Sequence, residues 1–340
     1  MRLTLPSLRT PRAAAVQPPA AVAVPDGGRW FARDEAIMGT AIHVELWSDD
    51  AALAQRAMDA VMAEMHRIDR LMSPYKSESE LSLVNRDAGA RAVAIGAEMY
   101  GLIERSLFFS RLSDGAFDIT YAGVGHLYDY RAGVAPDAAA LAQARATVGW
   151  QHLILDAGAR SVHFGKPGMR IDLGGFAKGH VVDTSIAILR RLGIQHAVVA
   201  AGGDSHVMGE RRGRPWSIAI RDPRDAKRVV AVLPLRDTSI STSGDYERYF
   251  ERDGVRHHHL IDPKTGTSPS ALRSVTILAA DGLTSEALSK CVFVMGLSRG
   301  MRLVESLPGV DAVVVDAAGA LFFSSGLAAA GHQGGGVTQQ

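Results

Sequence analysis

Hydrophobic residues recur at two different spacings along the chain, and each spacing predicts one kind of secondary structure. Ile42, Val44 and Leu46 occupy alternate positions, which is typical of a strand with one buried face. Beyond Asp50, which can cap a helix, apolar residues follow at intervals of three and four, and these predict a helix with one face in the core. The residues on that face are Met58, Val61, Met62, Met65, Ile68, Leu71 and Met72. We interpret its methionines as core side chains.

The same reasoning predicts elements in the rest of the chain. Helical spacing appears at residues 98–112 and, on the surface, at 136–148. A short strand is predicted at 169–173, then a helix at 176–192 closed by Gly193, then a strand at 196–201. The small polar run STSGDY, residues 241–246, predicts a loop whose hydroxyls suit a polar ligand. Strands and helices mix without strict alternation, which favours an α+β fold.

Composition narrows the class of protein. Of the 340 residues, 47% are hydrophobic and 21% are charged, which is typical of a globular chain with a large core. The net charge is +1 and the basic residues are dispersed, so we expect no nucleic-acid partner. No apolar stretch is long enough to span a bilayer. Cys291, the single cysteine, lies in an apolar run, and we expect a buried structural thiol there.

The two ends differ in composition from the rest of the chain. We expect one domain at residues 30–330, a disordered N-terminal arm at 1–29 and a flexible tail at 331–340. The arm is rich in Ala and Pro and has no continuous apolar segment and no cysteine for lipid attachment, so we do not interpret it as a signal peptide. These features favour a cytoplasmic protein, with a periplasmic location as the alternative if translation starts elsewhere.

The segment DLGGFAKG, residues 172–179, carries the clearest chemical signal. Two glycines form a turn between a strand and a helix, and the free N–H groups at a helix start favour phosphate. Lys178 would add a positive charge. The alternative is an ordinary turn with a surface lysine. The segment matches neither a Walker A loop nor a dinucleotide fingerprint.

Three consecutive histidines, His257, His258 and His259, precede the turn IDPKTG at residues 261–266. On an extended segment the first and third share a face. A metal site would need further ligands that the sequence does not locate, and the alternative is a set of exposed histidines before a turn.

Seven motifs, in order from Met38 to Gly266, resemble the ApbE family of flavin transferases. They are MGT (38–40), MSPY (72–75) with ELS (80–82) and Asn85, GAFD (115–118), DLGGFAKG (172–179), AGGD (201–204), TSGDY (242–246) and HLIDPKTG (259–266). Each motif alone is weak, whereas seven in the expected order are specific. The resemblance implies an ApbE-like, T-fold-related α+β fold of mixed sheets and packed helices, with FAD in a central cleft.

The resemblance also implies an activity, FAD:protein FMN transfer. Family members bind FAD, use Mg²⁺ at its diphosphate, attach FMN to a Thr or Ser hydroxyl of an acceptor flavoprotein that carries a flavinylation motif, and release AMP. His259 matches the histidine that is proposed to assist the hydroxyl. The FAD contacts implied by motif position, together with the neighbouring polar run, are Met38, Tyr75, Ala116, Phe117, Asp118, Asp172, Lys178, Ser243, Gly244, Asp245 and Ile261.

The chain departs from the family at the metal site. The resemblance places metal ligands at the carbonyl of Gly175 and at an Asp and a Thr four residues apart, whose places are taken by Glu286 and Lys290. A charged lysine is not a metal ligand, and Mg²⁺ requires near-octahedral oxygen coordination. We therefore expect weak or absent Mg²⁺ binding, with Lys290 as a catalytic candidate that supplies part of the charge. The alternative is a helical ion pair worth about 0.2–0.5 kcal/mol.

The same substitution leaves two other functions open. One is a non-catalytic FAD-binding protein, and the other is a FAD pyrophosphatase in which water replaces the acceptor hydroxyl.

Overall fold

The structure is a computed structural model that describes residues 27–333, and residues 1–26 and 334–340 lie outside the described part. The predicted arm at 1–29 and tail at 331–340 therefore fall largely outside it. Within it, the first strand begins at Arg29 and the last helix, α9 (Ser325–Gln333), ends two residues past the start of the predicted tail.

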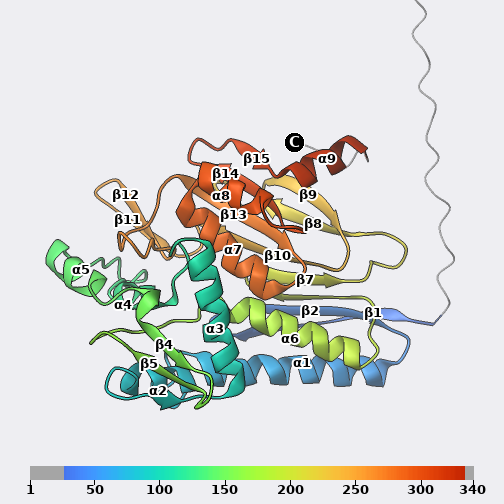
Figure 1. The fold of residues 1–340 in the computed structure, drawn as a ribbon. Coiled ribbons are helices and arrows are strands. Elements are labelled where there is room, and N and C mark those ends of the chain that lie inside the picture. Colours follow the sequence, from blue (N-terminus) through green and yellow to red (C-terminus); the bar gives the residue numbers. More distant parts are fainter. Residues whose placement is uncertain (1–26, 334–340) are drawn as a thin grey trace, which may run out of the picture.

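One large sheet runs through the centre of the molecule (Figure 1). Every neighbouring pair within it is antiparallel. Its strands, in spatial order, are β1 (Arg29–Ile37), β2 (Thr40–Ser48), β6 (Ala197–Ala201), β7 (Asp204–Met208), β10 (Thr238–Gly244), β13 (Leu272–Ala279), β14 (Asp311–Asp316) and β15 (Leu321–Phe323). The α+β fold predicted from the sequence is confirmed.

Helices cover one face of this sheet, and α1 and α6 lie side by side beneath it (Figure 1). The helices on this side are α1 (Ala51–Met72), α3 (Ala97–Leu112), α6 (Ala177–Arg191), α7 (Gly282–Met295) and α8 (Leu297–Glu305). The methionines of α1 are core residues as predicted, because Met58, Met62, Met65 and Met72 are all buried. Asp50 caps this helix, and its Oδ1 accepts hydrogen bonds from two backbone N–H groups at 2.8 and 3.0 Å.

A hairpin covers the opposite face. Strands β8 (Trp216–Arg221) and β9 (Val229–Leu235) pack on it and form a second apolar cluster with residues of the sheet. Val207, Ile240, Leu278 and Val313 are the sheet residues of that cluster. The central strands are thus buried on both faces, which explains the nearly continuous apolar sequence of β14.

Short elements surround the helical side. They are α2 (Glu80–Asp87), β3 (Val93–Ala94), η1 (Ile119–Tyr121), α4 (Ala122–Gly125), α5 (Ala138–Arg145), η2 (Trp150–His152), β4 (Leu153–Asp156), β5 (Ser161–Phe164), β11 (Tyr249–Arg252) and β12 (Val255–His258). The surface helix predicted at 136–148 is present as the shorter α5.

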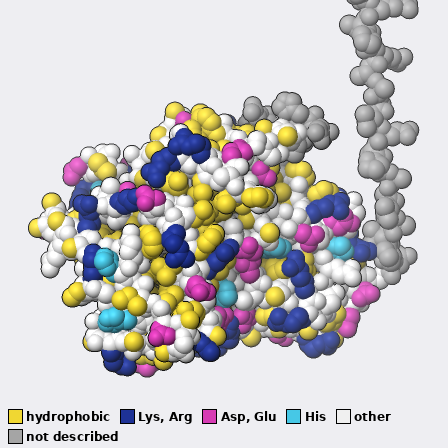
Figure 2. All heavy atoms as spheres, in the orientation of Figure 1, with side chains coloured by type: hydrophobic (Ala, Val, Ile, Leu, Met, Phe, Trp, Pro, Cys, Tyr) yellow, Lys and Arg dark blue, Asp and Glu magenta, His cyan; other side chains and the backbone are white. Residues whose placement is uncertain are grey.

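The molecular surface carries mixed charges. On the face shown in Figure 2, Lys and Arg side chains lie among acidic and hydrophobic ones. Tyr75 stands out because its side chain is 92% exposed. Among residues 27–333, no helix has both the length and the hydropathy needed to cross a membrane.

The strand predicted at residues 169–173 is absent, and this segment has no regular secondary structure. The side chain of Asn85 takes the place of a neighbouring strand, because its amide nitrogen donates to the carbonyl of Ile171 at 2.9 Å and its oxygen accepts the Ile171 N–H at 2.8 Å. The N–H of Asp172 donates to the Ile119 carbonyl at 2.9 Å. A side-chain amide therefore positions the segment that leads to the double-glycine turn.

The loop predicted at residues 241–246 is also wrong for most of its length, since Ser241, Thr242 and Ser243 lie within the central strand β10. Their hydroxyls bond to Asp204, Thr276 and Ser289, at 2.5, 2.8 and 2.8 Å. Small side chains suit this strand because α7 packs directly on it. Composition alone suggested a loop, but internal partners for the hydroxyls allow a buried strand.

We predict that Asn85→Ala lowers the free energy of unfolding by about 1–3 kcal/mol, because it leaves two backbone groups of Ile171 unpaired. Urea titration of the purified variant measures this. Gln55→Ala is the matched control, because Gln55 makes a single exposed hydrogen bond on α1 and its loss should cost little. Equal effects of the two substitutions would contradict the role given to Asn85.

Candidate functional site

The starts of helices α6 and α7 approach each other more closely than side chains would permit. A Cβ added to either Gly179 or Gly282 would overlap the backbone of the other. Glu286 accepts the N–H of Gly179 at 2.6 Å through Oε2. Asp183 in turn accepts the N–H groups of Gly282 and Leu283 at 2.6 and 2.9 Å. Two glycines and two carboxylates therefore lock the helix starts together.

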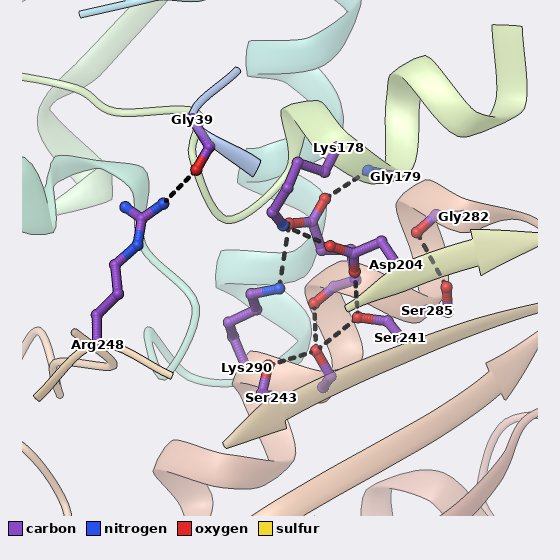
Figure 3. Close-up of polar contacts among 12 residues, drawn as sticks. Gly39, Lys178, Gly179, Asp204, Ser241, Ser243, Arg248, Gly282, Ser285 and Lys290 are labelled. Carbon is purple, nitrogen blue, oxygen red and sulfur yellow. Dashed lines mark hydrogen bonds and ion pairs between the residues drawn. The ribbon is translucent and has the colours of Figure 1, made fainter. Parts of the chain in front are cut away.

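Two lysines and two carboxylates form a cluster at this junction (Figure 3), and we call these four residues the ion cluster. Lys178 Nζ lies 2.5 Å from Asp204 Oδ2 and also contacts Glu286 Oε1. Lys290 Nζ lies 3.2 Å from the same Glu286 oxygen. The Glu286 side chain is fully buried, whereas those of Lys178 and Lys290 remain 24% and 17% exposed. The cluster thus presents its cations, and not its carboxylates, to solvent.

The pKa values within the ion cluster follow from burial and neighbouring charge. Burial opposes the charged form of Lys178, but the carboxylates of Asp204 and Glu286 outweigh it and raise the pKa of Lys178 above its usual value. Burial lowers the pKa of Lys290, with Lys178 acting in the same direction and Glu286 against it. Against the effect of burial, Lys178 and Lys290 keep the pKa of Asp204 below its usual value.

Buried serine hydroxyls lie next to the ion cluster and form hydrogen bonds with Asp204 and Glu286. Ser241 donates to Asp204 Oδ1 at 2.5 Å, and Ser289 lies 3.2 Å from Ser241 and 2.8 Å from Ser243. Ser289 also donates to the carbonyl of Glu286 at 2.8 Å. Ser243, which the resemblance assigned to FAD, is therefore tied into this internal network.

The backbone phosphate site predicted at the double-glycine turn is largely occupied by the protein's own acceptors. The N–H of Gly174 donates to the Asp172 side chain at 2.5 Å, and the N–H groups of Phe176 and Ala177 donate to the Leu173 carbonyl at 2.8 and 2.7 Å. The Gly179 N–H is taken by Glu286. The prediction is wrong for these four donors, and the positive character of the site comes from side chains.

His259 lies next to the cations of the site. Its backbone N–H donates to the Arg248 carbonyl at 3.1 Å. The Arg248 guanidinium in turn donates to the Gly39 carbonyl at 3.4 Å (Figure 3). Burial, with the charges of His258, Lys290, Arg248 and Lys178, lowers the pKa of His259 to about 3. The imidazole is therefore neutral at pH 7, and its Nδ1 has no hydrogen-bond partner among the described residues.

The neighbouring histidines have other surroundings. His258 is buried, with Nε2 2.9 Å from the Pro269 carbonyl, and His257 stacks on Phe250 at 4.9 Å. Within residues 27–333 no group of three or more His, Cys, Asp or Glu side chains is arranged to hold a metal ion. Of the three histidines, only His259 is associated with the ion cluster.

Met38 has a strained backbone at the tip of the β1–β2 hairpin. The two turn residues, Met38 and Gly39, have φ angles of 56° and 68°. A two-residue turn of this kind favours Asn-Gly, and methionine at a positive φ is uncommon. Strain of this kind clusters at functional sites, and the Met38 side chain also packs against the main hydrophobic core.

Asp172 lies on the same side of the molecule as Arg248. Burial raises the pKa of Asp172, and its charge, with burial, raises the pKa of Tyr121. Tyr75 and Arg248 also act on Tyr121. Four FAD contacts implied by the sequence, Met38, Tyr75, Asp172 and Lys178, thus lie around Arg248, Tyr121 and the ion cluster.

The other implied contacts are engaged within the protein. Asp118 accepts hydrogen bonds from Thr120 at 2.7 and 2.8 Å and from the Trp150 N–H at 2.9 Å. Asp245 is bonded by both guanidinium nitrogens of Arg224 at 2.6 Å. Ala116, Phe117, Gly244 and Ile261 are buried, and the ring of Phe117 lies 5.6 Å from that of Phe176.

A cavity of about 620 Å³ lies beside Asp118. Its lining also includes Gly115, Arg145, Trp150 and Lys264, but no member of the ion cluster. The hollow next to the GAFD motif is therefore separate from the cationic surface around Lys178 and Lys290.

Four residues in or next to the ion cluster and His259 were not among the predicted site residues: Asp204, Ser241, Ser289 and Arg248. Asp204 is the last residue of the AGGD motif and Ser241 directly precedes the TSGDY motif, so these two motifs could have indicated both residues. Nothing local marks Ser289 or Arg248, because their partners are far away in the sequence.

The residues at the implied metal position do not fit Mg²⁺. Glu286, the carboxylate at this position, already accepts one N–H group and two ammonium groups, and Lys290 offers no acceptor. A divalent ion would have to displace these donors before it could be coordinated.

Together, these features define an α+β protein with a partly open cationic site built on a double-glycine turn. The model of the ApbE family matches residues 38–314, and the chain belongs to this family. The assignment made from the sequence motifs is confirmed.

Curated relatives and solved structures agree with this assignment. The chain is 33% identical to a FAD:protein FMN transferase of Treponema pallidum, over 84% of each chain. It is 31% identical to one of Klebsiella pneumoniae, over 84% of this chain and 89% of the other. The crystal structure of an ApbE protein from Thermotoga maritima matches with a TM-score of 0.82 and 31% identity, over 88% of this chain and 99% of that one. A flavin transferase from Vibrio cholerae matches with a TM-score of 0.80 and 27% identity, over 89% and 99%.

We predict that Lys178→Met lowers the free energy of unfolding by about 3–5 kcal/mol, because two buried carboxylates lose their shared cation. Denaturant titration measures the loss. Lys76→Met is the control, since it breaks a lysine–aspartate pair at the same 2.5 Å distance whose lysine is 46% exposed, and we expect a cost below about 1 kcal/mol. A loss for Lys178→Met no larger than for Lys76→Met would show that the ion cluster does not stabilise the fold.

Proposed function

We propose that this protein is a FAD:protein FMN transferase, which moves the FMN part of FAD onto a Thr or Ser hydroxyl of an acceptor flavoprotein and releases AMP. The observation that carries the proposal is the position of Lys178, Lys290, Arg248 and His259 around one site in a chain of the ApbE family. The relatives of Treponema pallidum, Klebsiella pneumoniae and Vibrio cholerae described above are named for transfer, and none of them for storage or hydrolysis of FAD.

The chemistry requires neutralisation of the diphosphate bridge of FAD. In the transfer step the acceptor oxygen bonds to the phosphorus of FMN, and the bond from that phosphorus to the bridging oxygen breaks. Negative charge then develops on the departing AMP. Lys178 and Lys290 present partly exposed ammonium groups that can stabilise this charge in a site of low dielectric constant.

The acceptor hydroxyl must also lose a proton. His259 is neutral at pH 7, so one of its two ring nitrogens is unprotonated and can accept that proton. A bound diphosphate would offset the nearby cations that hold the His259 pKa low. His259 therefore acts as the base, while Met38 and Tyr75 supply apolar surface for the rings of FAD.

We predict covalent flavin on the acceptor when the purified protein is incubated with FAD and the acceptor protein of the Vibrio cholerae relative. In-gel flavin fluorescence after denaturation detects the product, and chromatography measures the AMP released. That relative is the positive control, and an acceptor whose modified Thr is replaced by Val is the negative control. Free FMN without protein-bound flavin, or unchanged FAD, would contradict the transferase and favour hydrolysis or simple binding, respectively.

We predict that His259→Ala lowers kcat for transfer by about 10²–10⁴-fold, as expected for loss of a general base, with little change in FAD affinity. Single-turnover kinetics and FAD fluorescence titration separate the two quantities. His257→Gln is the control, because this neighbouring histidine stacks on Phe250 and belongs to no part of the site. An unchanged kcat for His259→Ala would remove His259 from the mechanism.

We predict that Met38→Asn changes the free energy of unfolding by less than about 1 kcal/mol, because Asn tolerates the positive φ of this turn better but loses the packing of Met38 on the core. It should also weaken FAD binding by roughly tenfold, which is the loss of about 1.4 kcal/mol of apolar contact. Arg160→Asn is the matched control, since Arg160 has a φ of 48° in an exposed turn and should give a gain in stability without an effect on FAD binding. Unchanged FAD affinity in Met38→Asn would show that the strain serves no ligand.

A further inference from the structure

Lys290 occupies one of the three positions where the family resemblance places metal ligands, and its side chain lies beside the other two. Its Nζ lies 3.2 Å from Glu286 Oε1, in the place of the carboxylate ligand. Its side chain also lies beside the double-glycine turn, because a Cβ on Gly175 would be 3.7 Å from Lys290 Cε. The remaining position, that of the hydroxyl ligand, is the one from which Lys290 itself extends.

The oxygens that could receive a cation at this point are already used. Glu286 Oε2 accepts the Gly179 N–H at 2.6 Å, and Oε1 is shared by Lys178 and Lys290. Asp204, the next carboxylate, bonds Lys178 through one oxygen and Ser241 through the other, each at 2.5 Å. A metal ion would have to break this whole arrangement to gain its ligands.

The charge balance points in the same direction. Lys178 and Lys290 contribute two positive charges, and Asp204 and Glu286 contribute two negative ones, so the ion cluster is neutral as built. A divalent cation would leave two uncompensated positive charges at a site where one carboxylate is fully buried. An anionic ligand would be attracted instead, because the exposed part of the cluster consists of ammonium groups.

We propose that the Lys290 ammonium replaces the divalent cation in this chain, so that it binds FAD and transfers FMN without Mg²⁺. This inference rests on the proposed function for its transfer step. There, the acceptor oxygen bonds to the FMN phosphorus, the hydroxyl proton passes to His259, and the bond to the bridging oxygen breaks. AMP leaves with that oxygen and its electron pair, and the ammonium groups of Lys290 and Lys178 neutralise the charge. No co-reactant besides FAD and the acceptor is needed.

The two departures from the family's metal ligands can be reversed by mutation, and this provides the sharpest test. In the double variant Glu286→Asp with Lys290→Thr, the cluster keeps one lysine and two carboxylates and carries a net negative charge. The Gly175 carbonyl, the new carboxylate and the new hydroxyl then offer oxygen ligands that suit Mg²⁺. We expect this double variant to gain saturable Mg²⁺ binding that the natural chain lacks.

The first experiment measures binding alone. Mg²⁺ is titrated by calorimetry into the full chain after EDTA treatment, and FAD affinity is measured with millimolar Mg²⁺ and with EDTA. We expect no saturable Mg²⁺ binding, and a change in FAD affinity below about twofold, which is under 0.5 kcal/mol. The double variant should bind Mg²⁺, whereas Lys290→Met should bind FAD more weakly without gaining a metal site. Lys227→Thr, at an exposed lysine between β8 and β9, controls for loss of charge alone.

The second experiment measures transfer with and without EDTA. We expect the natural chain to keep its rate in EDTA and the double variant to lose at least about tenfold, equivalent to 1.4 kcal/mol. Saturable Mg²⁺ binding to the natural chain, or loss of its transfer in EDTA, would overturn the inference. Absence of transfer under every condition, with FAD affinity independent of Mg²⁺, would refute the transferase and leave the replacement of the metal supported by the calorimetry.

Discussion

The contact between Lys178 and Glu286 is the interaction on which the rest of the site depends. It joins the first turn of α6 to α7 across a junction where Gly179 and Gly282 leave no room for side chains. Because Glu286 is fully buried, its charge is tolerable only while the Gly179 N–H and two ammonium groups satisfy it. The same contact therefore holds the helices together and sets the charge that a ligand meets.

The arrangement separates stabilising charges from functional ones. Both carboxylates point into the protein, where Ser241 donates to Asp204 and the Gly179 N–H donates to Glu286. The lysines remain partly exposed, so an anion can approach the cations without competing for the buried oxygens. A metal site would require the opposite orientation, with free oxygens directed at the ligand.

Most of the elements predicted from sequence patterns are present, because their signals are local. The helix that Asp50 caps, its methionine-rich face and the helix that follows the double-glycine turn are all present. The strand predicted at 169–173 and the loop predicted at 241–246 are both wrong for one reason. In each case residues far away in the sequence supply the hydrogen-bond partners. Asn85 replaces a neighbouring strand for Ile171, and Asp204, Ser289 and Thr276 make a hydroxyl-rich sequence acceptable as a central strand.

The candidate site was predictable as a set of positions, but not as an electrostatic arrangement. Motifs placed Lys178, Glu286 and Lys290 in one site, yet no motif indicated that both oxygens of Glu286 are already hydrogen-bonded within the protein. Nor did any motif reveal the strain at Met38 or the place of Arg248 beside His259, since both depend on backbone geometry.

Anomalous diffraction tests the central claim most directly. Crystals of the FAD complex would be soaked in Mn²⁺, which stands in for Mg²⁺ and scatters anomalously. We expect no anomalous peak within coordination distance of Gly175 and Glu286, with the Lys290 ammonium still bonded to Glu286. A peak at that position, with the Lys290 side chain displaced from Glu286, would contradict the account.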